Sequence, residues 1–172
     1  MGIATDQRPP KKDLSEVEKL IRLHLRKGAT SKELTWVLLG GKSFMPKPPT
    51  SNLDFWTAGI QGIRRDAINR LAEVLEVPMT EMAALLHISY KTLTRKQNNE
   101  LLDNLLSSLC IEITETIANG LLVFEDRERL NRWLRKENRA LQQQRPIDLL
   151  RNPTGIRMIN AVLHRIEEGI HT

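Results

Sequence analysis

The side chains best suited to contact another molecule lie between Thr80 and Lys96, in the segment TEMAALLHISYKTLTRK. Its spacing predicts two short helices separated by three or four residues, the second capped by Ser89, which is the arrangement of a helix-turn-helix. Small and apolar residues fall where such a unit packs: Met82, Ala83, Leu86, Ile88 and Leu93. The candidate DNA-contacting residues are Ser89, Tyr90, Lys91, Thr92, Thr94, Arg95 and Lys96.

The charge of this segment favours a nucleic-acid partner. No Asp or Glu occurs between Met82 and Asn99, whereas three Lys and Arg residues do. Arginine suits guanine edges, threonine suits thymine methyls or phosphates, and lysine suits phosphates. The alternative is an ordinary helical hairpin with a solvated basic face, and we favour DNA contact because spacing, caps and charge agree. His87 departs from the pattern, since many such turns carry a glycine there and histidine is strained at positive φ.

Residues capable of covalent or metal chemistry are not grouped in the sequence. Gly41-Lys42-Ser43 matches the end of a phosphate-binding loop, but Trp36 stands where the first glycine of that loop is required. The four histidines are scattered, with no pair at i, i+4: His24, His87, His164 and His171. Cys110 lies among apolar residues at helical spacing, where a core thiol is expected. We therefore expect no enzymatic activity, no metal and no cofactor.

The elements that must position these residues are predicted to be helices in the N-terminal half of the chain. The segments Ser15 to Glu18 and Thr30 to Glu33 have the pattern of capping boxes at the start of two helices. The segment from Gly41 to Asn52 holds three prolines and predicts an irregular linker. Apolar residues from Ile63 to Leu75 predict a further helix, and Thr80 is expected to cap the next one.

Helices are also predicted for the second half. A long one is expected from about Glu100 to Val123, ~36 Å at the usual rise per residue, unless Gly120 bends or ends it. Asp126 and Thr154 are expected to cap two later helices, the last ended by Gly169. The fold class is mainly α. We expect a basic N-terminal helical arm and linker (1–54), a helix-turn-helix domain (55–99), a connecting or dimerisation helix (100–124) and a C-terminal domain (125–172).

Composition excludes several classes of protein. The chain has 172 residues, of which 40% are hydrophobic and 27% charged, the balance of a globular protein rather than a disordered one. No apolar run is expected to approach the ~20 residues of a membrane span, and no secretory signal precedes Lys12. One cysteine fits a reducing cytoplasm. The whole net charge of +5 lies in residues 1–50, which either contact phosphate or only solubilise the terminus.

The C-terminal third resembles a known family. The residues that carry the resemblance are Trp133-Leu134, Asn138 to Leu141, Pro146 to Leu150, Thr154-Gly155, Val162-Leu163 and Arg165 to Ile170. Together they resemble the C-terminal domain of the Xre/MbcA/ParS-type antitoxins, the partners of RES-domain toxins. Thr92 to Arg95 is similar to the Xre-like helix-turn-helix of the same family. The resemblance covers about Ile60 to Ile170, and the order and spacing of the motifs carry it rather than any single one.

The resemblance implies a function. Antitoxins of this family form dimers, bind the promoter of their own operon and sequester a RES toxin that consumes or uses NAD, with their final residues placed toward its active-site cleft. Carried over by position, the toxin-binding residues are Arg165, Glu168, Gly169, Ile170, His171 and Thr172. The chain departs from the family at Gln142-Gln143-Gln144, where glycine is common, and at His171, where a larger aromatic residue is frequent.

These implications define the leading hypothesis and its rivals. The leading hypothesis is a non-enzymatic cytoplasmic antitoxin and autorepressor, a homodimer within a hetero-oligomer with its toxin, that uses no membrane. The alternative is a stand-alone helix-turn-helix regulator whose C-terminal domain senses a ligand or another protein. A RES-type reading frame beside this one would favour the antitoxin. For the tail itself the alternative is a frayed terminus, the usual state of a chain end.

Overall fold

The computed structural model describes residues 15–169, and within this range it is helical, with no β-strand and two isolated bridges. The prediction of a mainly α fold is confirmed. The helices are α1 (Glu16–Arg26), α2 (Ser31–Leu39), α3 (Asn52–Gln61), α4 (Asp66–Leu75), α5 (Met79–Leu85), α6 (Tyr90–Arg95), α7 (Asn104–Phe124), α8 (Arg127–Arg135), α9 (Pro146–Leu149) and α10 (Pro153–Glu167), with 3-10 turns at Gly41–Ser43 and Arg139–Leu141.

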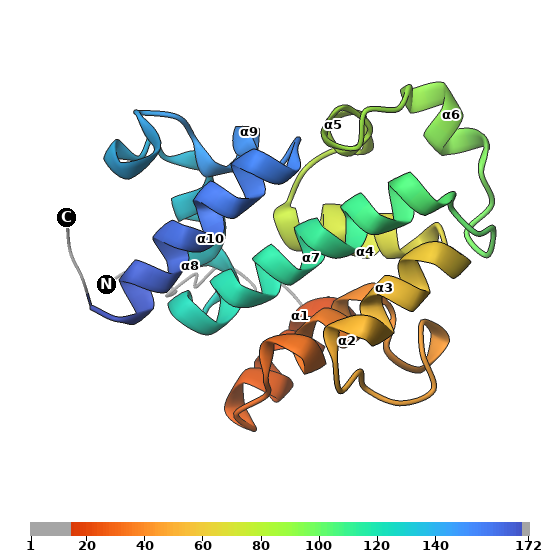
Figure 1. The fold of residues 1–172 in the computed structure, drawn as a ribbon, viewed down its shortest axis with the longest axis horizontal. Coiled ribbons are helices and arrows are strands. Elements are labelled where there is room, and N and C mark those ends of the chain that lie inside the picture. The colour runs from red at the N-terminus through yellow and green to blue at the C-terminus, as the bar shows by residue number, and fades with distance from the viewer. Residues whose placement is uncertain (1–14, 170–172) are drawn as a thin grey trace, which may run out of the picture.

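Helix α7 runs through the middle of the molecule, and most of the other long helices pack around it (Figure 1). Its side chains at Cys110, Ile113 and Ile117 are fully buried, in contact with a core that extends from α1 to α10. By length and hydropathy α7 could cross a membrane, but 61% of its most apolar window is buried inside the molecule. The prediction that no segment approaches this length is therefore wrong for α7, whose apolar side chains form the shared core.

The ends of α7 differ from the prediction by a few residues. Asp103 caps the helix through an oxygen that accepts from the backbone N–H of Leu106 at 2.9 Å, so α7 begins after Glu100. Gly120 neither bends nor ends the helix. A Cβ there would lie 2.6 Å from the Leu130 side chain, so the glycine allows α8 to approach α7 closely.

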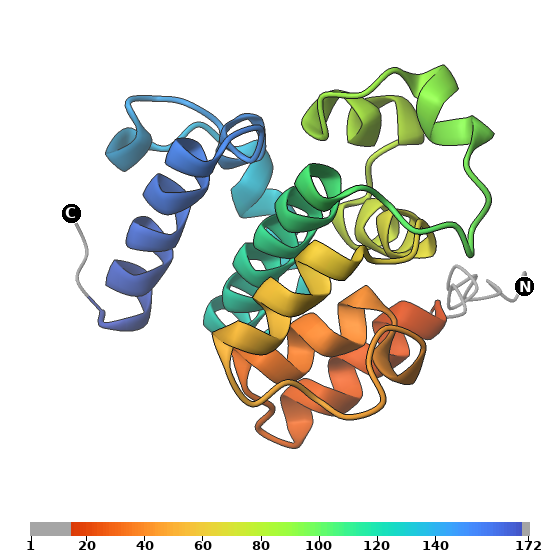
Figure 2. The same cartoon turned by 45° about the vertical axis from the view of Figure 1, so that its right-hand side comes forward.

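The N-terminal helices are packed into the body of the molecule. α1 and α2 contact α4, and α2 lies along α7 (Figure 2). The capping box at Thr30 is confirmed, with Glu33 bonded back to the Thr30 N–H at 2.7 Å. The box at Ser15 forms only in part. Its Glu18 carboxylate instead pairs with Arg22 at 2.8 Å and with Arg127 of α8 at 3.0 Å, because two cations compete with the helix end.

Helix α3 was not predicted, and it crosses the expected boundary at residue 54. Its buried side consists of Phe55, Ala58 and Gly59, and its outward side is also apolar. Small residues such as Gly59 face α7, whereas large apolar residues such as Trp56 point outward and are 64% exposed. The segment before it is not an open linker either, since the Phe44 and Phe55 rings stack 6.5 Å apart and the Trp36 indole N–H donates to the Met45 carbonyl.

Polar side chains of α8 bind the carboxyl end of α4. The last carbonyl groups of an α-helix have no partner within the helix. Asn131 donates to the Val74 carbonyl at 2.7 Å, and Arg135 donates to the Leu75 and Glu76 carbonyls. Arg127, one turn before Asn131, donates to the Glu73 carbonyl at 3.2 Å. Since the side chains at 127, 131 and 135 lie on one face of α8, we call this set of bonds the α8 clamp.

The α8 clamp predicts the effect of a substitution at its buried centre. Asn131→Leu keeps the size of the side chain but leaves the Val74 carbonyl without a donor in a buried position. We expect the free energy of unfolding, measured by urea titration, to fall by about 1–3 kcal/mol. Arg132→Ala, at the exposed neighbouring position, is the control and should change it by less than about 0.5 kcal/mol. Equal stability of N131L and the natural chain would show that the clamp is not needed.

Candidate functional site

The segment predicted to bind DNA folds as two short helices joined by a tight turn. α5 begins at Met79 after Pro78, one residue before the expected cap at Thr80. The cap of α6 is confirmed, since the Ser89 hydroxyl accepts from the Thr92 N–H at 2.9 Å. Leu93 is fully buried and holds α6 against α5. The two helices lie at one edge of the molecule, next to α4 (Figure 1).

The seven residues predicted to contact DNA separate into two groups in the structure. The hydroxyl groups of Ser89 and Thr92 bond to each other at 2.7 Å, and the Thr94 hydroxyl donates to the Tyr90 carbonyl, so these hydroxyls already have partners inside α6. The Lys96 ammonium pairs with Glu100 at 2.8 Å.

The second group projects from α6 into solvent. Tyr90, Lys91 and Arg95 are exposed. Neither Lys91 nor Arg95 has an ion-pair partner within residues 15–169. A phenol, an ammonium and a guanidinium are therefore presented together on the outer side of a short helix at the molecular surface. These groups can bond to phosphate oxygens and base edges without first breaking an internal contact.

His87 occupies the conformation that the sequence pattern reserves for glycine. Its φ is 56°, as expected for the turn, so the turn forms with a histidine in the left-handed region. The ring nitrogen Nε2 is hydrogen-bonded to the Arg151 carbonyl, in the loop between α9 and α10. Sequence reasoning did not find this contact, which joins the α5–α6 turn to the C-terminal segment.

A cleft of about 550 Å³ opens beside this contact. It is formed by the α5–α6 turn, the first half of α7 and the start of α10, and most of its lining is apolar: Leu86, Ile88, Leu105, Leu106, Leu109 and Pro153. His87, Asp103, Glu112 and Arg151 supply polar groups at its walls. A cleft of this size and lining is of the kind that binds small molecules or side chains of a partner.

The C-terminal segment is held on α7 by a chain of side-chain amides and hydroxyls. Ser31 of α2 donates to Asn119 of α7, Asn119 donates to Asn160 of α10 at 3.0 Å, and Asn160 donates to Thr116 at 2.9 Å. Because each donor meets an acceptor, three helices keep one relative register. Such a network is directional, whereas apolar packing is not.

The glutamine run 142–144 has a conformation that glycine favours. Gln142 and Gln143 have φ angles of 54° and 63°, in the left-handed region. The turn is held by hydrogen bonds between Asn138 and residues 143 and 144. The replacement of glycine by glutamine in this loop is therefore compatible with a tight glycine-type turn, at some cost in backbone strain.

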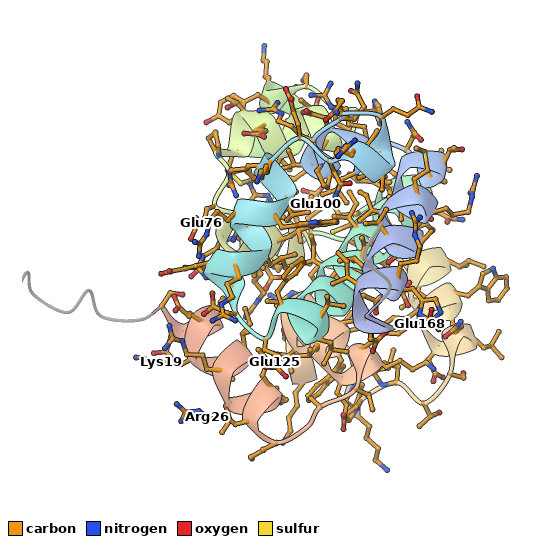
Figure 3. All side chains as sticks on the ribbon, turned by 90° about the vertical axis from the view of Figure 1, so that its left-hand side faces the viewer. Lys19, Arg26, Glu76, Glu100, Glu125 and Glu168 are labelled. Atoms are coloured by element: carbon orange, nitrogen blue, oxygen red, sulfur yellow. The ribbon has the colours of Figure 1, made fainter. Side chains whose placement is uncertain are left out.

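The residues predicted to bind a toxin lie at the end of α10. Cap residue Glu168 follows the last helical residue, Glu167, and Figure 3 shows Glu168 at the free end of the helix. Glu168 lies 3.3 Å from the His164 imidazole, and Arg165 is half-buried. Gly169 has a φ of 71° and takes the chain out of the helix. The other three predicted residues, Ile170, His171 and Thr172, lie outside the described residues.

The remaining candidate groups show no arrangement for catalysis. Cys110 is a core thiol as predicted, and burial raises the pKa of the thiol to about 12, which keeps it protonated at neutral pH. Gly41–Ser43 forms a 3-10 turn that directly follows α2 rather than a strand. Across residues 15–169, no group of three or more His, Cys, Asp or Glu side chains gathers as metal ligands would.

The strain at His87 predicts a difference between two substitutions. His87→Gly and His87→Ala both remove the bond to the Arg151 carbonyl, but only alanine keeps a Cβ at positive φ. We therefore expect the free energy of unfolding, measured by urea titration, to be about 1 kcal/mol lower for H87A than for H87G. A more stable H87A would mean that residue 87 does not hold the left-handed conformation in solution.

Comparisons with known proteins found a similarity in the C-terminal segment. Residues 120–169, from the end of α7 to Gly169, match the family model of the antitoxin Xre/MbcA/ParS C-terminal toxin-binding domain. A chain of the solved M. tuberculosis MbcT–MbcA toxin–antitoxin complex is similar over 63% of this chain and 96% of its own length, at 21% identity and a TM-score of 0.46. No curated protein matches the sequence. Over residues 120–169 the chain is thus similar to the Xre/MbcA/ParS C-terminal toxin-binding domain family.

Proposed function

We propose that this protein is the antitoxin of a toxin–antitoxin pair. In this proposal residues 125–172 bind a RES-domain toxin and block its NAD-consuming active site, and the α5–α6 unit represses the operon of the pair. The match of residues 120–169 to a toxin-binding domain is the observation that carries the proposal. The chain acts by occupying surfaces, so it needs folded contact elements rather than a catalytic group.

The end of α10 supports a role in obstructing a cleft. Helix α10 ends before Gly169, which has a φ of 71°. Glu168, at this end of α10, supplies a carboxylate. A cleft that holds the phosphates of a dinucleotide presents cations, and a carboxylate forms strong charge-assisted hydrogen bonds with such groups. The tail is therefore suited to compete with NAD.

The α5–α6 unit supports a role in DNA binding. α6 lies at the molecular surface with Lys91 and Arg95 unpaired within the described residues, and it lies away from the end of α10 (Figure 2). A dimer would present two such helices to half-sites about 34 Å apart. Toxin and DNA would then bind at separate places on one chain.

The cleft beside His87 favours one alternative function. A ligand of about the size of a metabolite fits 550 Å³, and the cleft lies between the α5–α6 turn and the C-terminal segment. A stand-alone regulator that senses such a ligand would use the same helix-turn-helix. Repression that responds to a metabolite in cells lacking any RES-type gene would favour this alternative.

Shortening the tail is predicted to weaken neutralisation. Deletion of residues 170–172 removes the groups proposed to enter the toxin cleft and leaves α10 intact. We expect cells that co-express this variant with the cognate toxin to grow more slowly than cells with the full chain. A variant in which Gly-Ser-Ser replaces residues 170–172 keeps the chain length and is the matched control for side-chain identity. Thermal unfolding verifies that both variants remain folded. Full rescue of growth by the deletion variant would show that the tail is not the inhibitory element.

Substitution of the two exposed cations of α6 is predicted to weaken DNA binding. Arg95→Ala should lower affinity for the upstream operon DNA by about 1–3 kcal/mol in a gel-shift titration, and Lys91→Ala should reduce the salt slope by about one. Arg129→Ala removes an exposed cation of α8, which is distant from α6 in the sequence. This control should bind the operon DNA as the natural chain does. Unchanged binding by R95A and K91A would exclude α6 as the DNA-reading helix.

A further inference from the structure

The cleft of about 550 Å³ lies between three segments that are far apart in the sequence. These are the α5–α6 turn, the first half of α7 and the start of α10, and the turn and the start of α10 lie on the same side of α7 (Figure 1, Figure 2). We call it the His87 cleft, because the bond from His87 to the Arg151 carbonyl joins two of its walls. Its volume is within the range of sites that hold small molecules.

The exposed part of the lining requires a ligand with an apolar body. Leu105 is 85% exposed, the highest value among the large hydrophobic side chains exposed in residues 15–169. Leu109 and Ile88 are only partly buried and line the same cleft. A hydrocarbon group in contact with these three side chains removes apolar surface from water, which favours binding.

Two polar side chains of the cleft already have partners within the protein. The Asp103 carboxylate accepts from the Leu106 N–H at 2.9 Å as the cap of α7. The Ser108 hydroxyl donates to the Asn104 side chain at 3.2 Å. A ligand that used either group would have to compete with these bonds at the start of α7.

Two side chains at the start of α10 keep donors that have no acceptor in residues 15–169. Arg151 is exposed and forms no ion pair there. The Asn152 side-chain oxygen accepts from the Gly155 N–H at 2.9 Å, which leaves its NH2 group available. Guanidinium and amide NH2 groups only donate hydrogen bonds, so they select an acceptor. The guanidinium favours a carboxylate, because it can bind both carboxylate oxygens at once.

The remaining acidic residue of the walls does not cancel this preference. Glu112 also lines an adjacent cleft of about 350 Å³ between α2, α7 and α10. Among the residues that line the adjacent cleft, Lys32 and Arg157 balance the charges of Glu112 and Glu115. The His87 cleft therefore combines an apolar lining with an unpaired cation, Arg151, at one end.

We propose that the His87 cleft binds a small apolar carboxylic acid, with its carboxylate on the Arg151 guanidinium and its hydrocarbon part on Leu105 and Leu109. The site is independent of the proposed toxin and DNA contacts, which use the end of α10 and the outer side of α6. A ligand in the cleft contacts the α5–α6 turn and the start of α10 together. It therefore stabilises the arrangement in which His87 bonds to the Arg151 carbonyl.

Titration of the full chain with octanoate tests the proposal, by calorimetry for affinity and by amide NMR spectra for location. Octanol, which has the same hydrocarbon chain but no charge, is the matched ligand. We expect octanoate to bind about tenfold more tightly than octanol, since a hydrogen bond between charged groups contributes more than one to a neutral group. The amide signals that shift should include those of His87, Leu105 and Arg151.

Three variants separate the parts of the site. Arg151→Met keeps the backbone carbonyl that bonds to His87, and it should remove the preference for octanoate while octanol binds as before. Leu105→Glu places a carboxylate in the cleft and should weaken octanoate binding about tenfold or more. Leu53→Glu, at a 65%-exposed leucine of α3 outside the cleft, is the matched control and should bind octanoate as the natural chain does. Circular dichroism verifies that the variants are folded.

Each result decides the proposal. A natural chain that gives neither heat nor shifted amide signals with octanoate would overturn it, as would equal affinities for octanoate and octanol. These two measurements need no variant, so they hold even where a variant fails to fold. Equal weakening by L53E and L105E would assign the hydrocarbon contact to α3 and would also overturn it. If the chain binds octanoate at the cleft but neither toxin nor operator DNA, the proposed function fails and the ligand site stands.

Discussion

The carboxyl end of α4 is the point at which the two halves of the molecule depend on each other. Its carbonyl groups at Val74, Leu75 and Glu76 receive donors from Asn131 and Arg135 of α8. Without Asn131, the Val74 carbonyl would be left buried and unpaired, at a cost of about 1–3 kcal/mol. α4 leads directly into the α5–α6 unit, and α8 begins the proposed toxin-binding segment. The proposed DNA-reading unit and the proposed toxin-binding segment are therefore parts of one body rather than modules on a linker.

Helix α7 supplies much of the core of that body, and side-chain hydrogen bonds define the register of the helices that pack on it. Ile113 and Ile117 are fully buried, and each contributes about 1.5–3 kcal/mol by removal of apolar surface from water. Apolar contact alone would let the surrounding helices slide. The bonds from Asn119 to Asn160 and from His87 to the Arg151 carbonyl define which turn of one element meets which turn of the other. The positions of the α6 surface and of the end of α10 follow from these few directional contacts.

The sequence predicted those elements whose signals are local. The caps at Thr30 and Ser89 depend on residues a few positions apart, and they were confirmed. The partner of Glu18 was not predictable in this way, because Arg127 lies 109 residues away in the sequence. Helix α3 was missed for a different reason. Large apolar residues lie on both of its sides, since Phe55 is buried and Trp56 is exposed, so hydrophobic periodicity does not mark its buried side. Of the candidate site, the α6 cations could be read from the sequence, whereas the contact of His87 with Arg151 required the fold.

The proposed function rests on association with a toxin, and co-purification tests it most directly. A tagged copy of the chain expressed together with the product of the adjacent gene should retain that product through affinity and size-exclusion steps, as one complex of defined stoichiometry. The account predicts that the retained protein is a RES-domain protein and that its NAD-consuming activity is silent in the complex. A chain that elutes free of its neighbour, while the neighbour stays active toward NAD, would contradict it.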